Sequence, residues 1–312
     1  MKIVFMGTPL AAVPTFERLV KDGHEVNAVY TQPDRPSGRG NKITFSPVKQ
    51  FAHDNQIPVF QPAKIKTPEA LATFESHNAD VAVVVAYGRI LPETFLNAFP
   101  YGAVNVHFSL LPKYRGAAPV NWAIANGETK TGVTTMKMDA GLDTGDILLQ
   151  SESAIGPQET APELMERLSM LGAELLSETL LRINEVIPQK QDNSAASFAP
   201  ILRREDGLID WQQSACEINN RVRGFQPFPS SYTYFKGQRV TIWKAKAVEQ
   251  FPSNNSVPGT AVSLEDKLLT VCCGNGSALA IEEIQPEGKR RISAVDFING
   301  NRLSVGDRFG TT

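Results

Sequence analysis

The sequence predicts an α/β protein, in which a doubly wound, mainly parallel Rossmann-like sheet is followed by a smaller C-terminal β-barrel domain of OB-like type. Over the first 190 residues, short apolar runs alternate with helix-length amphipathic segments, a pattern typical of a parallel sheet with helices on both faces. The run Val81–Tyr87 is continuously apolar, as expected of a strand buried on both faces. From Tyr232 onward, short strands separated by turn residues replace this alternation.

The elements of the first domain, residues 1–189, follow from hydrophobic periodicity. Seven strands are expected: Lys2–Gly7, Glu25–Gln32, Pro58–Gln61, Val81–Tyr87, Ala103–Leu111, Val133–Met138 and Ile147–Ser153. A helix is expected from Pro9 to Asp22, because Gly23 provides a stop signal. A long helix is expected over Thr160–Val186, where leucines recur at helical spacing.

A polar stretch without periodicity, Pro188–Phe198, predicts an interdomain linker, which we place at residues 190–204. The second domain then spans residues 205–312. It should open with a short helix and turn closing at Arg221–Phe228, followed by a hairpin around Gly237. Further strands are expected at Thr260–Leu264, Leu268–Cys273 and Leu279–Ile284.

Composition excludes several classes of protein. With 42% hydrophobic and 21% charged residues among 312, the chain resembles an ordinary folded protein, and no run approaches the roughly 20 apolar residues of a membrane span. Three cysteines, without a Cys-x-x-Cys pair, argue against a disulfide framework or a zinc site and favour the cytoplasm. The net charge of −2 disfavours a nonspecific nucleic-acid binder. Since no coiled-coil pattern is present, we expect a monomer.

Polar residues within an otherwise apolar strand are the candidates for catalysis. Asn105 and His107 are two residues apart, so on a strand both side chains point to the same face. An amide and an imidazole can hydrogen-bond an oxyanion, and a carboxylate can orient the imidazole or relay protons. Spacing alone does not choose among Asp139, Asp143 and Asp146 for that carboxylate. A purely structural histidine flanked by ordinary Asp-Gly turns is the alternative.

Two other functional classes are weighed against an acyl-type transfer. Gly7-Thr8-Pro9 follows the first strand but lacks both Gly-x-Gly-x-x-Gly and the Gly-Lys-Ser/Thr ending, which argues against a nicotinamide-dependent dehydrogenase or an ATP-binding enzyme. A noncatalytic RNA-binding protein on the same scaffold would not need the combination of Asn105, His107 and a carboxylate.

The run Asn-Val-His-Phe-Ser-Leu-Leu-Pro-Lys-Tyr-Arg-Gly at 105–116, with Gly-Leu-Asp-Thr-Gly-Asp at 141–146, resembles the signature of the folate-dependent formyltransferases. The resemblance implies that Asn105 and His107 stabilise a tetrahedral oxyanion. It also implies that Asp143 holds His107 and an ordered water that moves protons. Phe108 departs from the family, whose members often carry glycine there, so the pocket wall should differ locally.

The same resemblance implies that 10-formyltetrahydrofolate is the formyl donor and that no metal is needed. Backbone atoms after the fourth strand would hold the pterin ring, and two further loops would complete the pocket. The folate-binding residues implied are Tyr87, Gly88, Arg89, Ile90, Leu91, Ser109, Leu110, Leu111, Pro112, Asp139, Ala140 and Gly141.

The acceptor is inferred from residues 32–49, where Arg35, Arg39, Lys42 and Lys49 are opposed only by Asp34. Such a basic Gly/Pro loop can order against a phosphate backbone. It resembles the insertion of those formyltransferases that act on the α-amine of methionyl initiator tRNA for translation initiation. The segments 204–211 and 223–229 resemble the start of the family's C-terminal barrel, which would assist tRNA binding. Formyltransferases of amino-sugar nucleotides share the catalytic set and the barrel but generally lack the loop.

Overall fold

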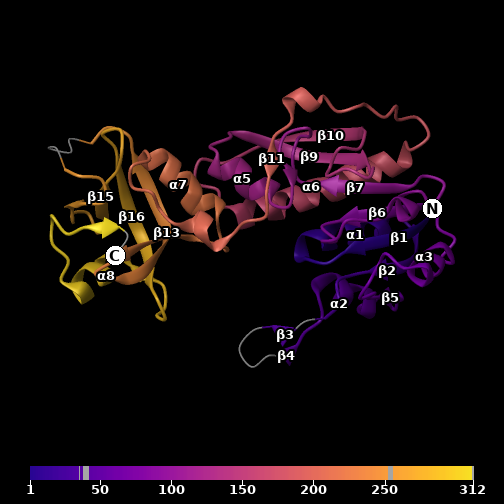
Figure 1. Cartoon of the computed structure of the whole chain (residues 1–312), viewed down its shortest axis with the longest axis horizontal. Helices are drawn as coiled ribbons and strands as arrows, with labels where there is room; N and C mark the ends of the chain where they lie inside the picture. The colour runs from indigo at the N-terminus through magenta and orange to yellow at the C-terminus, as the bar shows by residue number, and fades with distance from the viewer. Residues whose placement is uncertain (35, 38–41, 252–255, 311–312) are drawn as a thin grey trace. The chain divides into compact units, whose positions relative to one another are not determined.

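The chain, described here by a computed structural model, forms two compact units (Figure 1). The structure describes residues 1–34, 36–37, 42–251 and 256–310, without the side chains of residues 36–37 and 42–43. The first unit comprises Met1–Pro119, Lys130–Ala154 and Met165–Pro200, and the second comprises Val120–Thr129, Ile155–Leu164 and Ile201–Thr312. Two segments from within residues 1–189 therefore cluster with the C-terminal part of the chain.

The first unit is built on a mainly parallel sheet, as predicted. Across the sheet the strands are β10 (Ile147–Ala154), β9 (Lys130–Lys137), β7 (Ala103–His107), β6 (Val81–Val85), β1 (Lys2–Gly7), β2 (Glu25–Tyr30) and β5 (Val59–Phe60). The pairings from β5 through β7 are parallel, whereas β9 and β10 are antiparallel additions. The predicted doubly wound fold is confirmed.

Helices follow most of these strands in the chain. They are η1 (Leu10–Ala12) with α1 (Val13–Lys21), α2 (Pro47–Asp54), α3 (Pro68–Glu75), α4 (Glu93–Leu96) and α6 (Ala161–Leu181). Several elements are shorter than periodicity predicts, and two of them end at least four residues early. The strand expected to reach Leu111 ends at His107, because residues 108–114 turn away from the sheet. The helix expected to reach Val186 ends at Leu181, where Arg182–Glu185 form turns instead.

Short pieces complete the first unit. They are the pair β3 (Pro36–Ser37) and β4 (Lys42–Ile43), the parallel pair β8 (Arg115–Gly116) and β11 (Phe198–Ala199), and the 3₁₀ turn η2 (Asn193–Ala195). The β8–β11 pair joins the segment after β7 to the polar segment expected to be a linker.

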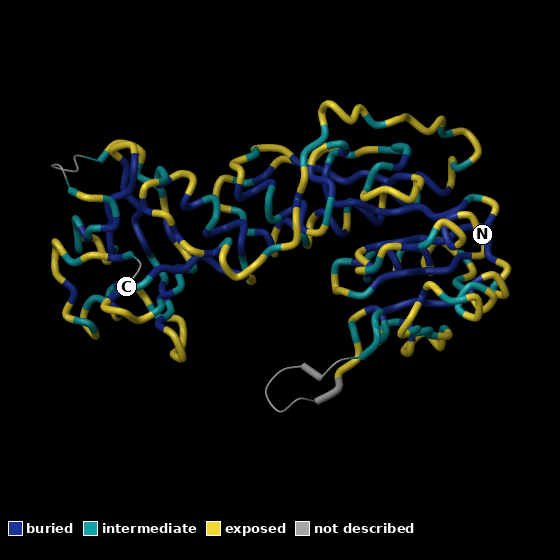
Figure 2. Tube along the Cα trace, viewed as in Figure 1, coloured by how far each residue is buried: buried dark blue, intermediate teal, exposed yellow. Residues whose placement is uncertain are grey.

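Alternation along the central strands directs apolar side chains to both faces of the sheet, whose strands are buried along much of their length (Figure 2). On one face, Val4 and Met6 belong to a cluster with Phe74 of α3 and Phe95 of α4. On the other face, Phe5 stacks on Phe16 of α1 with ring centroids 4.7 Å apart. The helices therefore cover both faces of the sheet.

The second unit contains a curled antiparallel sheet that forms a half-barrel. Its strands run β14 (Ala261–Ser263), β15 (Leu269–Cys272), β16 (Ala278–Pro286), β13 (Gln238–Val248), β12 (Ser231–Phe235) and β18 (Phe309–Gly310), and β17 (Ile292–Ser293) pairs with β16. Hydrogen bonds from Phe309 N to Gly259 O (2.7 Å) and from Ala261 N to Asp307 O (2.8 Å) bring the two sheet edges together. The predicted barrel-like C-terminal fold is confirmed.

Helical elements pack on this sheet or on one another. They are α5 (Pro119–Ala125), the 3₁₀ turn η3 (Arg204–Gly207), α7 (Ala215–Gly224) and α8 (Ala294–Asn301). The approach of α5 to α7 is close at Gly224, where an added Cβ would lie 2.7 Å from Asn121 O and 2.8 Å from Ala125 N. The Asn121 amide donates to Gly224 O (2.7 Å), and Trp122 contacts Phe225 edge-on. None of the helices in the described ranges combines the length and the apolar character needed to cross a bilayer.

Phe74→Ala tests the core of the first unit. Phe74 is fully buried and contacts the rings of Tyr30, Phe95 and Phe99. The substitution should lower the free energy of unfolding by about 3–5 kcal/mol in urea titrations, because a ring-sized cavity remains. The exposed Phe198, changed to Ala, is the matched control and should stay within about 0.5 kcal/mol of the unchanged chain. Equal effects of both substitutions would contradict this packing.

Candidate active site

The carboxyl ends of β1, β6 and β7 share one edge of the first sheet. Gly7 pairs with Val85, and Val84 pairs with Asn105, both in parallel register. The chain first builds outward from β1 through β2 and β5, then continues on its other side with β6. Ligands of open α/β sheets bind outside the carboxyl ends of strands at such a switch point. The loops after β6 and β7 are therefore the first place to look for a site.

Asn105 and His107 lie two residues apart on β7 and are 8% and 6% exposed. Their side chains point to the same face, as predicted from their spacing. Within the described ranges, no hydrogen bond links the Asn105 side chain to another residue. The Asn105 amide keeps access to solvent, so this donor is available to a ligand.

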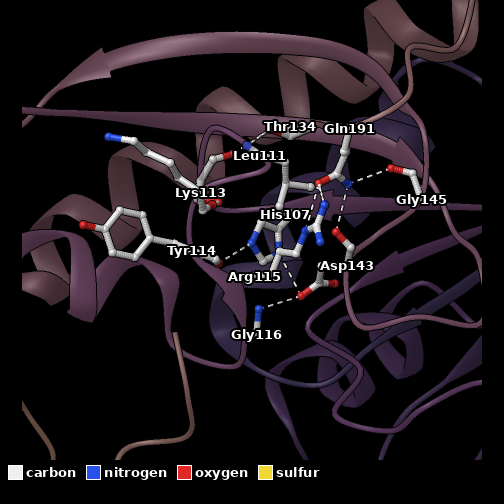
Figure 3. Close-up of polar contacts among 11 residues, drawn as sticks. His107, Leu111, Lys113, Tyr114, Arg115, Gly116, Thr134, Asp143, Gly145 and Gln191 are labelled. Carbon is white, nitrogen blue, oxygen red and sulfur yellow. Dashed lines mark hydrogen bonds and ion pairs between the residues drawn. The ribbon is translucent and has the colours of Figure 1, made fainter. Parts of the chain in front are cut away.

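The orientation of the His107 ring is fixed from one side. Its Nε2 lies 3.0 Å from Tyr114 O, and because a carbonyl only accepts, Nε2 carries the proton. Its Nδ1 lies 3.7 Å from Asp143 Oδ2 (Figure 3), longer than a hydrogen bond. The ring therefore faces the carboxylate without direct bonding, and an imidazole protonated on both nitrogens would be an ion-pair partner of Asp143.

Asp143 is the one of the three candidate carboxylates that the structure pairs with His107. Its Oδ2 accepts from Gly116 N (2.8 Å), and its backbone has φ of 52°, a left-handed conformation that aspartate tolerates better than most residues. Asp139 instead stabilises its own turn, accepting from Gly141 N and from the Thr144 hydroxyl. Asp146 uses its backbone carbonyl to accept from Lys137 N.

Gly145 shapes the loop that carries Asp143. A Cβ at this position would lie 1.9 Å from Lys137 O, so any other residue would push the loop away from β9. The Gly-Leu-Asp-Thr-Gly-Asp motif is thus partly a packing requirement of this loop.

The loop after β6, which contains five of the predicted folate residues, has an unusual backbone. Ala86 has φ of 47° and Gly88 has φ of 82°, and the left-handed region costs a residue such as alanine roughly 1–2 kcal/mol. The Tyr87 ring is buried in the core, while its carbonyl accepts from Thr8 Oγ1 (3.3 Å) and Gln32 Nε2 (3.0 Å). Strain held at a strand end is a frequent feature of functional loops.

The remaining residues of this loop differ in their contacts and in their exposure to solvent. The Arg89 guanidinium donates to Gln32 Oε1 and to the carbonyls of Pro62 and Ala63. Ile90 is 72% exposed, whereas Leu91 is buried. Gly88 lines a cleft of about 520 Å³ with residues of the 32–34 and 44–47 segments, and Arg89 and Ile90 line a second cleft of about 420 Å³.

The turn after β7, with the predicted folate residues Ser109, Leu110, Leu111 and Pro112, is held by buried and partly buried hydrogen bonds. The Thr134 hydroxyl donates to Ser109 O (2.6 Å) and accepts from Leu111 N (3.1 Å). Gln150 Nε2 donates to Leu111 O (2.9 Å) and to Thr134 Oγ1 (2.9 Å). Sequence reasoning missed Thr134 and Gln150, although polar residues on strands flanking the motif were the available signal. Ala140 and Gly141, the other predicted contacts, are exposed on the Asp143 loop.

Of the predicted cationic residues, Lys49 alone has a described side chain. Arg35 and Arg39 lie outside the described residues, as does the side chain of Lys42. The Lys49 ammonium pairs with Asp34, donates to Gln61 Oε1 (2.7 Å) and lies 4.1 Å from the Phe45 ring centroid. Hydrogen bonds from Lys49 and Gln61 hold the pKa of Asp34 below its usual value, against the opposing effect of partial burial.

Asp34→Asn should change how stability depends on pH. Because the pKa of Asp34 is lowered in the folded state, its stabilising contribution is present above the ordinary carboxyl pKa of about 4 and is lost as pH falls through the lowered value. Urea unfolding from pH 7 to pH 3 should show the variant less stable at neutral pH and the difference shrinking in acid. A difference that does not vary with pH would show that the ion pair is not its source.

Comparison with known proteins identifies both halves of the chain. Residues 1–180 match the family described as formyl transferase, and residues 201–302 match the formyl transferase C-terminal domain. The methionyl-tRNA formyltransferase of Solibacter usitatus is 50% identical over 312 residues, which cover 99% of each chain. That of Geobacter metallireducens is 48% identical with the same coverage.

Solved structures share the fold. An N-formyltransferase from Helicobacter canadensis, in complex with folinic acid and dTDP-3-aminofucose, aligns with a TM-score of 0.65 at 22% identity, covering 92% of this chain and 99% of that one. A methionyl-tRNA formyltransferase from Clostridium thermocellum aligns with a TM-score of 0.56 at 19% identity, covering 79% and 93%.

Proposed function

This chain belongs to the formyl transferase family, and we propose that it transfers the formyl group of 10-formyltetrahydrofolate to the α-amine of methionyl initiator tRNA. The observation that carries the proposal is the unpartnered Asn105 amide beside His107, which faces Asp143. Full-length relatives named methionyl-tRNA formyltransferase, at 50% and 48% identity, support the choice of acceptor. The structure with folinic acid supports a folate donor.

The reaction we propose is a direct attack that needs no covalent enzyme intermediate. The α-amine nitrogen bonds to the formyl carbon, and the carbonyl electrons move to oxygen, where Asn105 and His107 stabilise the negative charge. The oxyanion then reforms the carbonyl and the bond to N10 breaks. A water held by Asp143 takes a proton from the attacking nitrogen and delivers one to N10. Since an α-amine has a pKa near 8, part of it is already neutral at pH 7.

The contact to Tyr114 bears on the role of His107. With Nε2–H donating to Tyr114 O, a ring protonated on both nitrogens would keep this contact. It would then offer Nδ1–H to the oxyanion or to the water held by Asp143. The geometry therefore favours Tyr114 as the group that orients the ring, with Asp143 facing its Nδ1 and holding the water that carries the proton.

We assign catalysis to residues 1–189, a connecting role to 190–204, and assistance in tRNA binding to residues 205–312. Arg35, Arg39 and Lys42 are proposed to contact the phosphate backbone of the acceptor. Lys49 would have to exchange Asp34 for a phosphate, so we expect it to contribute less. In the C-terminal unit, the Arg291 guanidinium lies over the Trp243 ring, 4.0 Å from its centroid.

The test is formyl transfer by the purified protein from 10-formyltetrahydrofolate. Charged initiator tRNA, charged elongator methionyl-tRNA and a 4-amino sugar nucleotide are compared as acceptors. Rapid transfer to the initiator tRNA is expected. Transfer to the sugar nucleotide alone would keep the chemistry and overturn the acceptor, and no transfer to any acceptor would overturn both.

Asn105→Ala should lower kcat by roughly 10²–10³-fold, the usual cost of one oxyanion donor. Asp143→Asn should lower it by roughly 10²–10⁴-fold, because proton transfer is impaired. Asn97→Ala, on the exposed end of α4, is the control and should leave kcat unchanged. Initial rates at saturating concentrations of both substrates measure these effects, and full activity of Asn105→Ala would remove it from the mechanism.

Arg39→Ala should act on tRNA binding rather than on chemistry. The KM for charged initiator tRNA should rise by about tenfold, the equivalent of one lost charged hydrogen bond, with kcat nearly unchanged. The dependence of this KM on salt concentration should also become shallower. A fall in kcat at unchanged KM would contradict the assignment.

A further inference from the structure

The segment expected to be a linker is an ordered part of the first unit along residues 191–199. Ser197 N donates to Pro112 O (3.3 Å), Arg115 N to Ser197 O (2.9 Å) and Ala118 N to Ala199 O (3.2 Å). This segment therefore lies along the chain that follows the catalytic strand β7.

Gln191 uses both ends of its side-chain amide in this arrangement (Figure 3). Its Oε1 accepts from Arg115 Nε (3.0 Å) and Nη2 (2.7 Å). Its Nε2 donates to Asp143 O (2.8 Å) and to Gly145 O (2.7 Å). Two donors and two lone pairs are thereby all used, so the orientation of the amide is determined by its surroundings.

Arg115 fixes the position of the Gln191 amide through its hydrogen bonds to Oε1. Its side chain is buried, 4% exposed, and Nη2 also donates to Asn193 Oδ1 (2.9 Å). The acceptors are neutral amide oxygens rather than carboxylates, and a buried cation is costly without such partners. Arg115 therefore holds Gln191 in one position instead of leaving it mobile.

Asp143 is held from two sides by these groups. Its carboxylate accepts from Gly116 N, and its own carbonyl accepts from Gln191, which Arg115 anchors. Arg115 and Gly116 are consecutive residues of β8, so one short strand fixes both the backbone and the carboxylate. The backbone of Asp143 has a left-handed φ of 52°, a conformation that persists where the surroundings over-determine it.

We propose that Gln191 is a positioning residue for formyl transfer, which sets the distance between the Asp143 carboxylate and His107 by tethering the loop of residues 143–145 to Arg115. The inference rests on the proposed function of Asp143. Gln191 does not touch the reacting atoms; it acts through the position of the loop.

Two variants of Gln191 separate tethering from stability. Gln191→Glu keeps an oxygen acceptor for Arg115, which thereby gains a charged partner. The second carboxylate oxygen replaces the Nε2 donor that faces the carbonyl oxygens of Asp143 and Gly145. The loop of residues 143–145 therefore loses its tether. Gln191→Met has a similar length and removes both contacts, so Arg115 loses an acceptor. Gln189→Glu, at an exposed position two residues before Gln191, controls for added negative charge.

The experiment measures kcat, the KM for 10-formyltetrahydrofolate and for charged initiator tRNA, and the thermal unfolding midpoint of each full-length variant. Displacing a catalytic group by about 1 Å can cost 10²-fold in rate. We therefore expect kcat to fall by about 10²-fold in both Gln191 variants, with both KM values little changed. The unfolding midpoint should fall in Gln191→Met and less, or not at all, in Gln191→Glu. Gln189→Glu should match the unchanged chain.

Two results would overturn the inference while the proposed function stands. One is that the unchanged chain transfers the formyl group and Gln191→Glu has the same kcat. The other is a loss of kcat that follows the loss of thermal stability across the variants, with both KM values rising, as expected of a merely structural residue. If the unchanged chain itself transfers no formyl group to any acceptor, the proposed function fails and the inference fails with it.

Discussion

The parallel pairing of β6 with β1 on one side and with β7 on the other is the constraint on which the candidate site depends. Parallel neighbours end at the same edge of a sheet, so the loop after β6 and the turn after β7 emerge side by side. The antiparallel strand β9 runs the opposite way, with Lys137 beside Val104 and Thr134 beside His107. The loop that carries Asp143 therefore starts near the N-terminal end of β7, whereas His107 lies at the C-terminal end. The loop has to extend back toward that end to bring Asp143 to His107.

Where these segments meet at the site, polar groups are buried, and each of them needs a hydrogen-bond partner. Each unsatisfied one costs about 1–3 kcal/mol, and here Thr134, Arg115 and His107 all find neutral partners in carbonyl or amide groups. Asn105 differs, because its amide has no hydrogen-bonding partner among the described residues and keeps access to solvent. A rigid polar framework around one unpaired donor is the arrangement expected where a bound group has to supply the missing partner.

Much of this could be predicted from sequence, for identifiable reasons. The buried strand Val81–Val85 and the shared face of Asn105 and His107 follow from periodicity of two. The helices α2 and α3 were not placed individually, although Ser46 and Thr67, each followed by proline, cap their first turns. The contacts of Gln191 and Asp143 join residues 48 positions apart through an irregular loop, and no local pattern encodes such a meeting. The same holds for α5, whose neighbours are set by Gly224.

The close packing of α5 on α7 has a consequence for how such genes can be recombined. The helix is encoded in the middle of the N-terminal match to the family, residues 1–180, yet it clusters with residues 201–312. A chimera joined at codon 200 would pair the α5 of one parent with the α7 of the other. Positions 121 and 224 would then come from different parents, and the contact between them would form only if the two parents carry compatible residues there. The division between the two compact units therefore does not fall at a single position of the sequence.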